Sequence, residues 1–483
     1  MATHLVWISR VPGFHFDEAW AANFAHRIAF EPGFWPLYAQ SPYTSPWSHY
    51  LVAAAFRIFG VSLAVFRATG IAMVALGVAQ LSAALAVFGH RRAASNLPWI
   101  VAASLPLILN HRFSIELTTF HVFCFGLFAW GTAFFWKGRT RLGGALAWCG
   151  FVLGVTSHLL FLSVGLALLA ASVIRRSRLP EEARPWVILT TVSLLPFFCQ
   201  VFRLVPERDK SSALLVCDVL ILLWATLAGG RNPIPESSRR AADWILRAAC
   251  APFLLMLLFF AEGHWSVLQI HGGIAQPILF GLSFFCGAAA VVLNRHELGR
   301  RLPKEWITWA CVLIFVTGCL MLKPAARYFE IPLLVLAILL SLVLEFPKWR
   351  SSMTLLGFFF VLGISQFISN YWSPGRDYSQ REARIHFLIF KDESRDFLPK
   401  QQLAVALGAR GCGIGSIKSE DGRVMEALRF LSFSDWKIDA TKICPAKEIW
   451  VARRAQPPVE PGLKLLEVIG EFLVFTPDKG GSS

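Results

Sequence analysis

Two adjacent carboxylates, Asp17 and Glu18, lie near the start of the chain, directly after His15-Phe16. Side chains of neighbouring residues cannot share one face of a helix. At most one of the two acids is therefore expected to point into a cavity, while the other caps a helix or forms an ion pair. The run Ala-Trp-Ala-Ala-Asn-Phe-Ala that follows is helix-like, and an acid before it would serve as its N-cap. Taken alone, the pair predicts a reactive carboxylate or a capped helix equally well.

The composition indicates which elements must position these acids. Of the 483 residues, 55% are hydrophobic and only 16% are charged, and the mean hydropathy is +0.54. A water-facing surface of normal charge density cannot be built from this composition. The 41 Phe and 18 Trp residues, beside only 6 Tyr, suit lipid-facing and interfacial packing. We therefore expect a membrane bilayer to be the solvent of most of the chain.

Apolar stretches long enough to cross about 30 Å of hydrocarbon follow one another along the chain. We expect such stretches at 63–88, 98–111, 117–136, 142–157, 159–174, 187–203, 212–228, 246–261, 274–294, 306–323, 329–346 and 353–372. Because the segment after residue 10 is expected outside, either the N-terminus is extracytoplasmic or residues 1–10 are the end of a further helix. The expected total is therefore about 12–13 transmembrane helices.

The loops between these stretches alternate in charge, which gives the orientation. One set is basic and is expected in the cytoplasm by the positive-inside rule; it comprises the loops around 90–92, 137–141, 175–178, 231–240, 295–304 and 348–350. The other loops, the segment 11–60 and the tail are expected on the extracytoplasmic side, of a bacterial inner (plasma) membrane. The net charge of +15 therefore reflects topology, and nucleic acid is not an expected partner.

The composition changes to that of a soluble protein after residue 372. Runs at 448–452 and 463–475 predict strands, and about 110 residues suffice for a small domain. Cys412 and Cys444 both lie in this tail, where a disulfide would be compatible with an extracytoplasmic location. The sequence thus predicts an all-α polytopic membrane bundle with a small C-terminal α+β extracytoplasmic domain. Its three parts are an N-terminal segment and first outer loop with interfacial helices (1–62), the transmembrane region (63–372) and the soluble domain (373–483).

Short motifs in the sequence resemble those of the GT-C superfamily of membrane glycosyltransferases. Three stretches resemble the first outer loop of the family: Pro12-Gly13-x-x-x-Asp17-Glu18, Ser45 to Tyr50, and Phe56 to Ser62 with Phe66-Arg67. The similar branch holds the dolichyl-phosphate-mannose protein mannosyltransferases and the lipid A aminoarabinose transferase. His111 to Glu116 resembles the second outer loop of the family, and Lys323 to Pro332 resembles the Arg-Tyr segment before a late helix.

The resemblance implies an inverting transfer of a hexose or pentose from a polyprenyl-phosphate sugar to a lipid, glycan or protein acceptor at the outer membrane face. Asp17 matches the general base, which takes a proton from the acceptor hydroxyl as that hydroxyl attacks the anomeric carbon. Glu18 matches its partner and would orient or cap the loop. If the acceptor is itself a phosphate, no base is required and Asp17 would position the acceptor.

A lipid phosphate is the leaving group in this reaction, and its growing negative charge requires cations in a dry site. Arg327 and Lys323 are expected to bind it, with Tyr328 as a hydrogen-bond donor. The alternative is that both cations snorkel from a helix end to the lipid headgroups.

Four further residues are candidates for substrate binding: Arg112, Glu116, His158 and His15. The resemblance makes Glu116 a candidate second carboxylate in the cavity, although Arg112 and Glu116 are four residues apart and also fit a simple helix pair. His158 lies in a short outer turn, where it could contact phosphate or be an interfacial histidine with its own hydrogen bonds.

No cofactor is expected, because the lipid-linked sugar is a co-substrate. The histidines, among them His111, His121, His264 and His271, do not form a metal-binding pattern on one predicted helix. We expect no required metal, although a divalent ion is left open. Two alternatives are a transporter or lipid flippase, in which inverted repeats and broken helices are usual, and a polymerase or ligase of lipid-linked polysaccharide. The sequence does not predict the oligomeric state.

Overall fold

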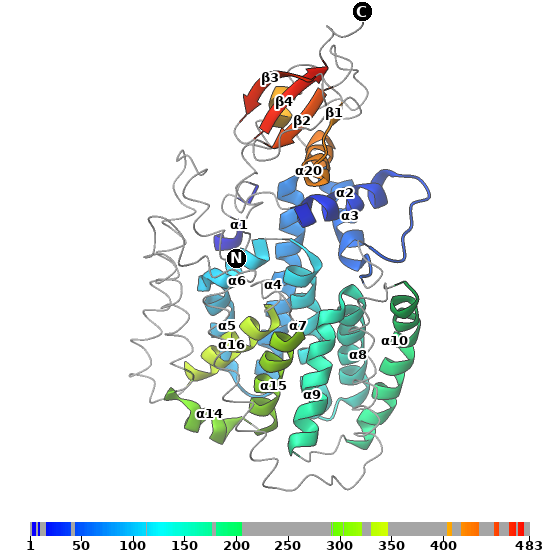
Figure 1. The fold of residues 1–483 in the computed structure, drawn as a ribbon. Helices are drawn as coiled ribbons and strands as arrows, with labels where there is room; N and C mark the ends of the chain where they lie inside the picture. The colour runs from blue at the N-terminus through cyan, green and yellow to red at the C-terminus, as the bar shows by residue number, and fades with distance from the viewer. Residues whose placement is uncertain are drawn as a thin grey trace, which may run out of the picture.

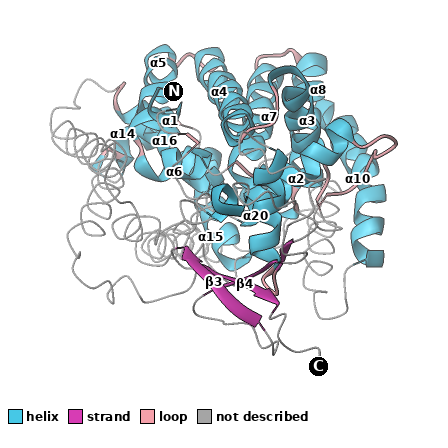
Figure 2. Cartoon of the chain, turned by 90° about the horizontal axis from the view of Figure 1, so that it is seen from above, coloured by secondary structure: helices cyan, strands magenta, loops and turns pink. Residues whose placement is uncertain are grey.

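The computed structural model describes residues 2–5, 8–9, 16–39, 44–112, 114–175, 180–204, 291, 293–302, 304–320, 330–345, 403–407, 417–433, 449–453, 463–469 and 472–477. These residues form a helical bundle with a small sheet beyond one end of it (Figure 1). Two helices, α2 (Phe16–Phe30) and α3 (Trp47–Phe59), lie between the bundle and the sheet. Seen from above, the same two helices lie over the bundle and close to α20 (Gly422–Phe433) (Figure 2).

The bundle consists of helices that pack on partners near and far in the sequence. They are α1 (Ala2–Leu5), α4 (Leu63–Val87), α5 (Arg91–Ala103), α6 (Leu105–Arg112), the π-helix η1 (Glu116–Phe120), α7 (His121–Trp136), α8 (Thr140–Ser157), η2 (Leu159–Phe161), α9 (Leu162–Arg175), η3 (Glu181–Ala183), α10 (Arg184–Leu204), α14 (Arg295–Arg301), α15 (Lys304–Leu320) and α16 (Glu330–Val343). Examples of such packing are α7 with α8, α9 with α15 and α5 with α16. A mostly helical chain is therefore confirmed.

The expected apolar stretches coincide with helices wherever the structure describes them. In that part of the chain, two helices are long and apolar enough to cross a membrane, Leu63–Val87 and Leu117–Trp136. Two such helices are weak evidence by themselves, because the core helix of a soluble protein passes the same test. The stretches expected at 212–228, 246–261 and 353–372 lie outside the described residues, as does 274–294 apart from residues 291, 293 and 294. The membrane location therefore continues to rest on composition and loop charge.

The stretch expected at 98–111 differs from the prediction, because it is broken into α5 and α6. Ser104 lies between the two helices with an extended backbone and ends α5 by donating its N–H to the carbonyl of Ile100. Two residues later Pro106 has no N–H to donate to the carbonyl of Ala102, so an unbroken helix would lose a hydrogen bond there. The break allows α6 to turn toward the sheet side of the bundle with Asn110 and His111 at its end.

Glycine contacts bring α4, α7 and α8 unusually close together. A Cβ atom added at Gly77 of α4 would overlap the backbone of Val122, and one added at Gly126 of α7 would overlap the carbonyl of Gly77. Gly131 and Gly143 meet in the same way between α7 and α8. Small residues that let helix backbones touch are typical of helix packing in membranes, where no hydrophobic force drives the helices together.

The C-terminal residues form the expected small α+β unit. Its sheet has the order β1-β2-β4-β3, with β1 (Ile417–Lys418) parallel to β2 (Ile449–Arg453) and β4 (Phe472–Pro477) antiparallel to β2 and to β3 (Leu463–Ile469). The run expected at 463–475 is therefore two strands. Alternate residues of β2 and β4 are buried against α20 (Gly422–Phe433), as in a sheet with one covered face.

A buried histidine lies between α2 and α3. The side chain of His49 is 4% exposed and meets the ring of Phe24 edge-on, with 5.2 Å between ring centroids. Arg57, two turns further along α3, donates from Nε to the carbonyl of Ala29 near the end of α2 at 2.7 Å. The two helices therefore form a compact pair in which His49 is removed from water.

We expect the substitution Gly126→Val to destabilise the bundle, because the new side chain must push α7 away from α4. Overpacking of this kind costs about 1–3 kcal/mol. A matched control is Gly299→Ala in α14, where an added Cβ meets open space and the helix gains in propensity. Thermal unfolding in detergent would show a lower midpoint for Gly126→Val only. Equal midpoints for both variants would contradict this packing.

We also expect the free energy of unfolding to fall on acidification because of His49. Burial lowers the pKa of His49 to about 4 from its usual 6.5, so between these values only the unfolded chain binds the proton. The stability present above pH 6.5 is therefore lost progressively toward pH 4, by about 3 kcal/mol in total. Denaturation at pH 7 and pH 4.5 should show a smaller difference for His49→Phe than for the parent, and an unchanged difference would refute the assignment.

Candidate active site

The carboxylate of Glu18 is held in a fully buried ion pair with Arg67 of α4. Arg67 donates from Nε to Oε1 at 2.8 Å and from Nη2 to Oε2 at 2.7 Å, and both side chains are 0% exposed. The backbone N–H of Ser114 also donates to Oε1 of Glu18 at 3.3 Å. On its other side, Arg67 donates from Nη1 to the carbonyl of Ile8 at 2.8 Å. Glu18 thus forms a buried ion pair with α4.

A glycine makes room for this arrangement. Gly70 lies one turn after Arg67 on the same face of α4, and a Cβ added there would overlap the side-chain hydroxyl of Ser114. The chain near Ser114 can therefore approach α4 closely enough for its N–H to reach Glu18. Three elements, α2, α4 and the segment between α6 and η1, are joined at this point.

Asp17 lies in the first turn of α2 and is partly buried. Successive residues of a helix point about 100° apart, so Asp17 does not share the direction in which Glu18 is held by Arg67. A carboxylate in the first turn also lies where the helix dipole favours negative charge. Asp17 is therefore placed on a fixed helix end, beside a neighbour whose position is set by a buried pair.

A second buried polar cluster joins α1, α6 and α16. Glu330, the first residue of α16, accepts hydrogen bonds from Nδ2 of Asn110 at 2.8 Å and from Nε2 of His111 at 2.7 Å. Nδ1 of His111 lies 3.0 Å from Nε2 of His4, and the two rings stack. All of these side chains are at most 1% exposed. The start of α16 is thus fixed to the end of α6 across the bundle.

Residues 110–114 connect the two buried clusters. Asn110 and His111 hold Glu330, and Ser114 contacts Glu18. Arg112, which lies between them in the sequence, is 0% exposed. This short segment therefore contacts both Glu18, the neighbour of Asp17, and Glu330, which follows the Lys323–Tyr328 stretch in sequence. Residue 113 of the segment lies outside the described residues.

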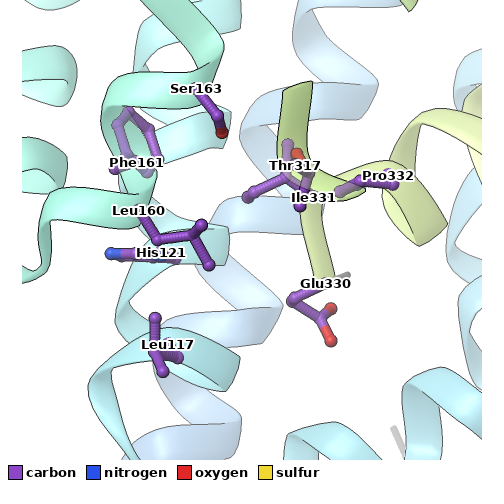
Figure 3. Close-up of a pocket in the computed structure, with 9 residues that line it drawn as sticks. All are labelled: Leu117, His121, Leu160, Phe161, Ser163, Thr317, Glu330, Ile331 and Pro332. Carbon is purple, nitrogen blue, oxygen red and sulfur yellow. The ribbon is translucent and has the colours of Figure 1, made fainter. Parts of the chain in front are cut away.

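A small pocket lies beside Glu330, between the helices of the bundle (Figure 3). Its walls combine apolar side chains with the polar side chains of His121, Ser163, Thr317 and Glu330. The cavity volume is about 10 Å³, enough for about one water. In the view of Figure 3 the Glu330 carboxylate points away from the side of the pocket where the hydroxyl groups of Ser163 and Thr317 lie. The pocket is too small for a sugar and borders the buried cluster.

The structure places the other expected site residues as follows. Nδ1 of His158 accepts a hydrogen bond from the N–H of Leu160 at 3.1 Å and caps η2, which is a structural role. Arg112 ends α6 and Glu116 begins η1. A simple pair on one continuous helix is therefore wrong, because the chain between them leaves the helix. His15, Lys323, Arg327 and Tyr328 lie outside the described residues.

Sequence reasoning assigned no role to Arg67, Asn110, His111 or His4. Arg67 carried a signal, because a charge inside the apolar stretch 63–88 is costly unless it is paired. The stretch Ser45 to Tyr50, which resembles the family, anchors the loop after α2 through contacts that the sequence did not predict. Trp47 donates from Nε1 to Oγ1 of Thr156 at 3.1 Å, and the N–H of Ser45 donates to the Thr156 carbonyl at 2.8 Å. Among the described residues, no group of three or more His, Cys, Asp or Glu side chains could hold a metal ion.

No protein-family model and no curated protein matches the sequence. Among solved structures, the chain is similar to ArnT from Cupriavidus metallidurans, in the apo state and bound to undecaprenyl phosphate. Identity is 12%, the TM-scores are 0.43 and 0.42, and the match covers 98% of this chain and 95% and 96% of those chains.

The chain is also similar to the oligosaccharyltransferase AglB from Archaeoglobus fulgidus, in complex with an inhibitory peptide and a dolichol-phosphate. Here the identity is 15%, the TM-score is 0.47, and the match covers 78% of this chain and 55% of that one. ArnT and this oligosaccharyltransferase are GT-C superfamily membrane glycosyltransferases, the superfamily that the sequence motifs resemble. Identities and TM-scores this low carry no argument about activity, which is argued from the chain's own residues.

We expect Arg67→Met to destabilise the protein strongly, because it leaves the Glu18 carboxylate buried without its cation. The loss of one partner of a buried pair costs about 3–5 kcal/mol, whereas replacing both partners by apolar residues costs much less. The double variant Arg67→Met with Glu18→Met should therefore be more stable than Arg67→Met alone.

Helix α2 offers a control for this experiment. Arg27 and Glu31 form an exposed pair at 2.6 Å, so Glu31→Gln should leave the stability close to that of the parent. Chemical denaturation in detergent would measure all three variants. If Arg67→Met cost no more than Glu31→Gln, the buried pair would not have the structural role described.

Proposed function

We propose that the protein is a membrane glycosyltransferase that moves a sugar from a polyprenyl-phosphate donor to an acceptor hydroxyl on the extracytoplasmic side. The observation that carries this proposal is the fixed end of α2. Glu18 is held by Arg67 and Ser114, which sets the position of Asp17 beside it. The motif in which these acids occur is the one that resembles the GT-C family.

In this proposal Asp17 is the general base. Its carboxylate takes the proton of the acceptor hydroxyl as the oxygen forms a bond to the anomeric carbon. The bond between that carbon and the phosphate oxygen breaks at the same time, and its electron pair leaves with the lipid phosphate. Attack from the face opposite the phosphate inverts the anomeric configuration.

The charge that develops on the phosphate requires cations, and we assign this role to Arg327 and Lys323, with Tyr328 as a hydrogen-bond donor. Support comes from the position of Glu330, which follows these three residues in the sequence. Glu330, three residues after Arg327, is held by Asn110 and His111, so the chain that leaves these residues enters α16 at a fixed point. The same segment of chain, 110–114, contacts Glu18.

The substitution Asp17→Asn should abolish transfer while the protein still binds the lipid. Loss of a general base lowers the rate by about 10²–10⁴-fold, and the phosphate contacts are unaffected. The assay uses purified protein, undecaprenyl-phosphate hexose or pentose and a membrane extract as acceptor, with binding of undecaprenyl phosphate measured in parallel.

Glu31→Gln, which changes an exposed acid just beyond the other end of α2, is the control and should transfer as the parent does. Transfer by Asp17→Asn at the parent rate would remove Asp17 from the mechanism. A parent protein that binds no polyprenyl phosphate and transfers none of these sugars would defeat the proposed function as a whole.

A further inference from the structure

Helix α20 of the C-terminal unit is seated directly on α2. The amide nitrogen of Asn23, in the middle of α2, donates both to the backbone carbonyl of Glu426 at 2.9 Å and to its carboxylate oxygen Oε2 at 2.7 Å. The other carboxylate oxygen of Glu426 accepts from Arg429 at 2.7 Å. Asn23 is 5% exposed and the Glu426 side chain is 21% exposed, so this polar contact is partly shielded from water.

Apolar contacts surround the polar one. Phe430 is 0% exposed and belongs to the same hydrophobic core as the inner residues of α2 and α3, with its ring centroid 6.3 Å from that of Phe56. The ring of Phe433 stacks on His26 at a centroid distance of 3.9 Å and an interplanar angle of 6°. Because α20 packs on α2 through these residues, it lies between the sheet and α2 (Figures 1 and 2).

The opposite face of α20 belongs to a different core. Val424, Leu428 and Leu431 are at most 1% exposed and pack with the strands of the C-terminal sheet. A single helix therefore contributes one face to the sheet and the other to α2. Any displacement of the sheet relative to the bundle must move α20 or break one of these two cores.

Helix α2 is consequently fixed at several points. Its start is held by the pair of Glu18 with Arg67, and its later part packs on α3. Asn23 follows Glu18 by five residues, about 7.5 Å along the helix axis. Each contact removes part of the freedom of the helix to pivot, and the contact through Asn23 joins α2 to α20. The direction in which Asp17 points thus depends on how α20 is seated.

We infer that the C-terminal domain helps to position the proposed active site, and that Asn23 is the positioning residue that links its helix α20 to the helix carrying Asp17. The inference rests on the proposed function for its kinetic consequence, but its structural part can be tested without any substrate. Five residues of helix turn Asn23 well away from the direction of Glu18, so its contact orients the helix without touching the reacting atoms.

The first test uses the full chain and the variant Asn23→Asp, which sets a second carboxylate against Glu426. Backbone hydrogen exchange of residues 17–22 should become at least tenfold faster, while exchange in α7 stays unchanged. Adding Glu426→Gln gives the introduced carboxylate an amide partner and should restore most of the protection. The control Arg429→Ala removes only the half-exposed partner of Glu426 and should leave α2 as it is.

The second test measures transfer with the lipid donor. Asn23→Asp should lower kcat about tenfold with the KM for the donor unchanged, and the double variant should recover it. A change confined to KM, or a kcat equal to that of the parent, would overturn the inference. If Asn23→Asp does not fold, the variant Phe433→Ala takes its place, because it removes the ring stack on His26. Hydrogen exchange of residues 17–22 and the transfer kinetics are then measured as before.

The two hypotheses fail separately. If the parent transfers no sugar, the proposed function fails and the exchange measurement alone decides the inference. Faster exchange at residues 17–22 that is reversed by Glu426→Gln then supports it. Faster exchange that stays within α20 and the sheet refutes it.

Discussion

The buried pair of Glu18 with Arg67 sets the geometry on which the candidate site depends. Removing two charges from water is costly, and the cost is offset only when the remaining donors and acceptors are met in good geometry. Here the carboxylate receives donors from Arg67 and Ser114, and the guanidinium also reaches the carbonyl of Ile8. A single pair thereby fixes α2, α4, the segment after α6 and the chain before α2 relative to one another.

The bundle supplies a firm base for this pair because its helices touch through glycine. Gly77 and Gly126 bring α4 and α7 into backbone contact, and Gly70 leaves room on α4 for the side chain of Ser114. The second cluster, in which Asn110 and His111 hold Glu330, extends this rigidity to α16. Polar groups buried at this depth are costly unless each meets a partner, so both clusters favour one arrangement of the helices over others.

Much of the helical framework could be predicted from the sequence, and most of the contacts within the site could not. Apolar stretches of the length of α4, α7 or α10 are visible in composition alone, and the runs predicted at 448–452 and 463–475 contain strands, although the second run is two strands. The break at Ser104 was missed, although Pro106 marked it. The contact of His111 with Glu330 joins residues 219 positions apart, and no local pattern encodes such a distance. Arg67 is the exception, because a lone charge in an apolar stretch requires a partner.

The composition changes from apolar to that of a soluble protein at residue 373, but α20 packs on residues from both sides of this boundary. One helix completes two cores, so the C-terminal unit is joined to the N-terminal segment as parts of one interlocked body. Asn23 and Glu426 stand 403 positions apart and must remain complementary for the body to close. In related proteins, these two positions are expected to change together. A C-terminal unit transferred from a distant relative should pack correctly only when the α2 of that relative is transferred with it.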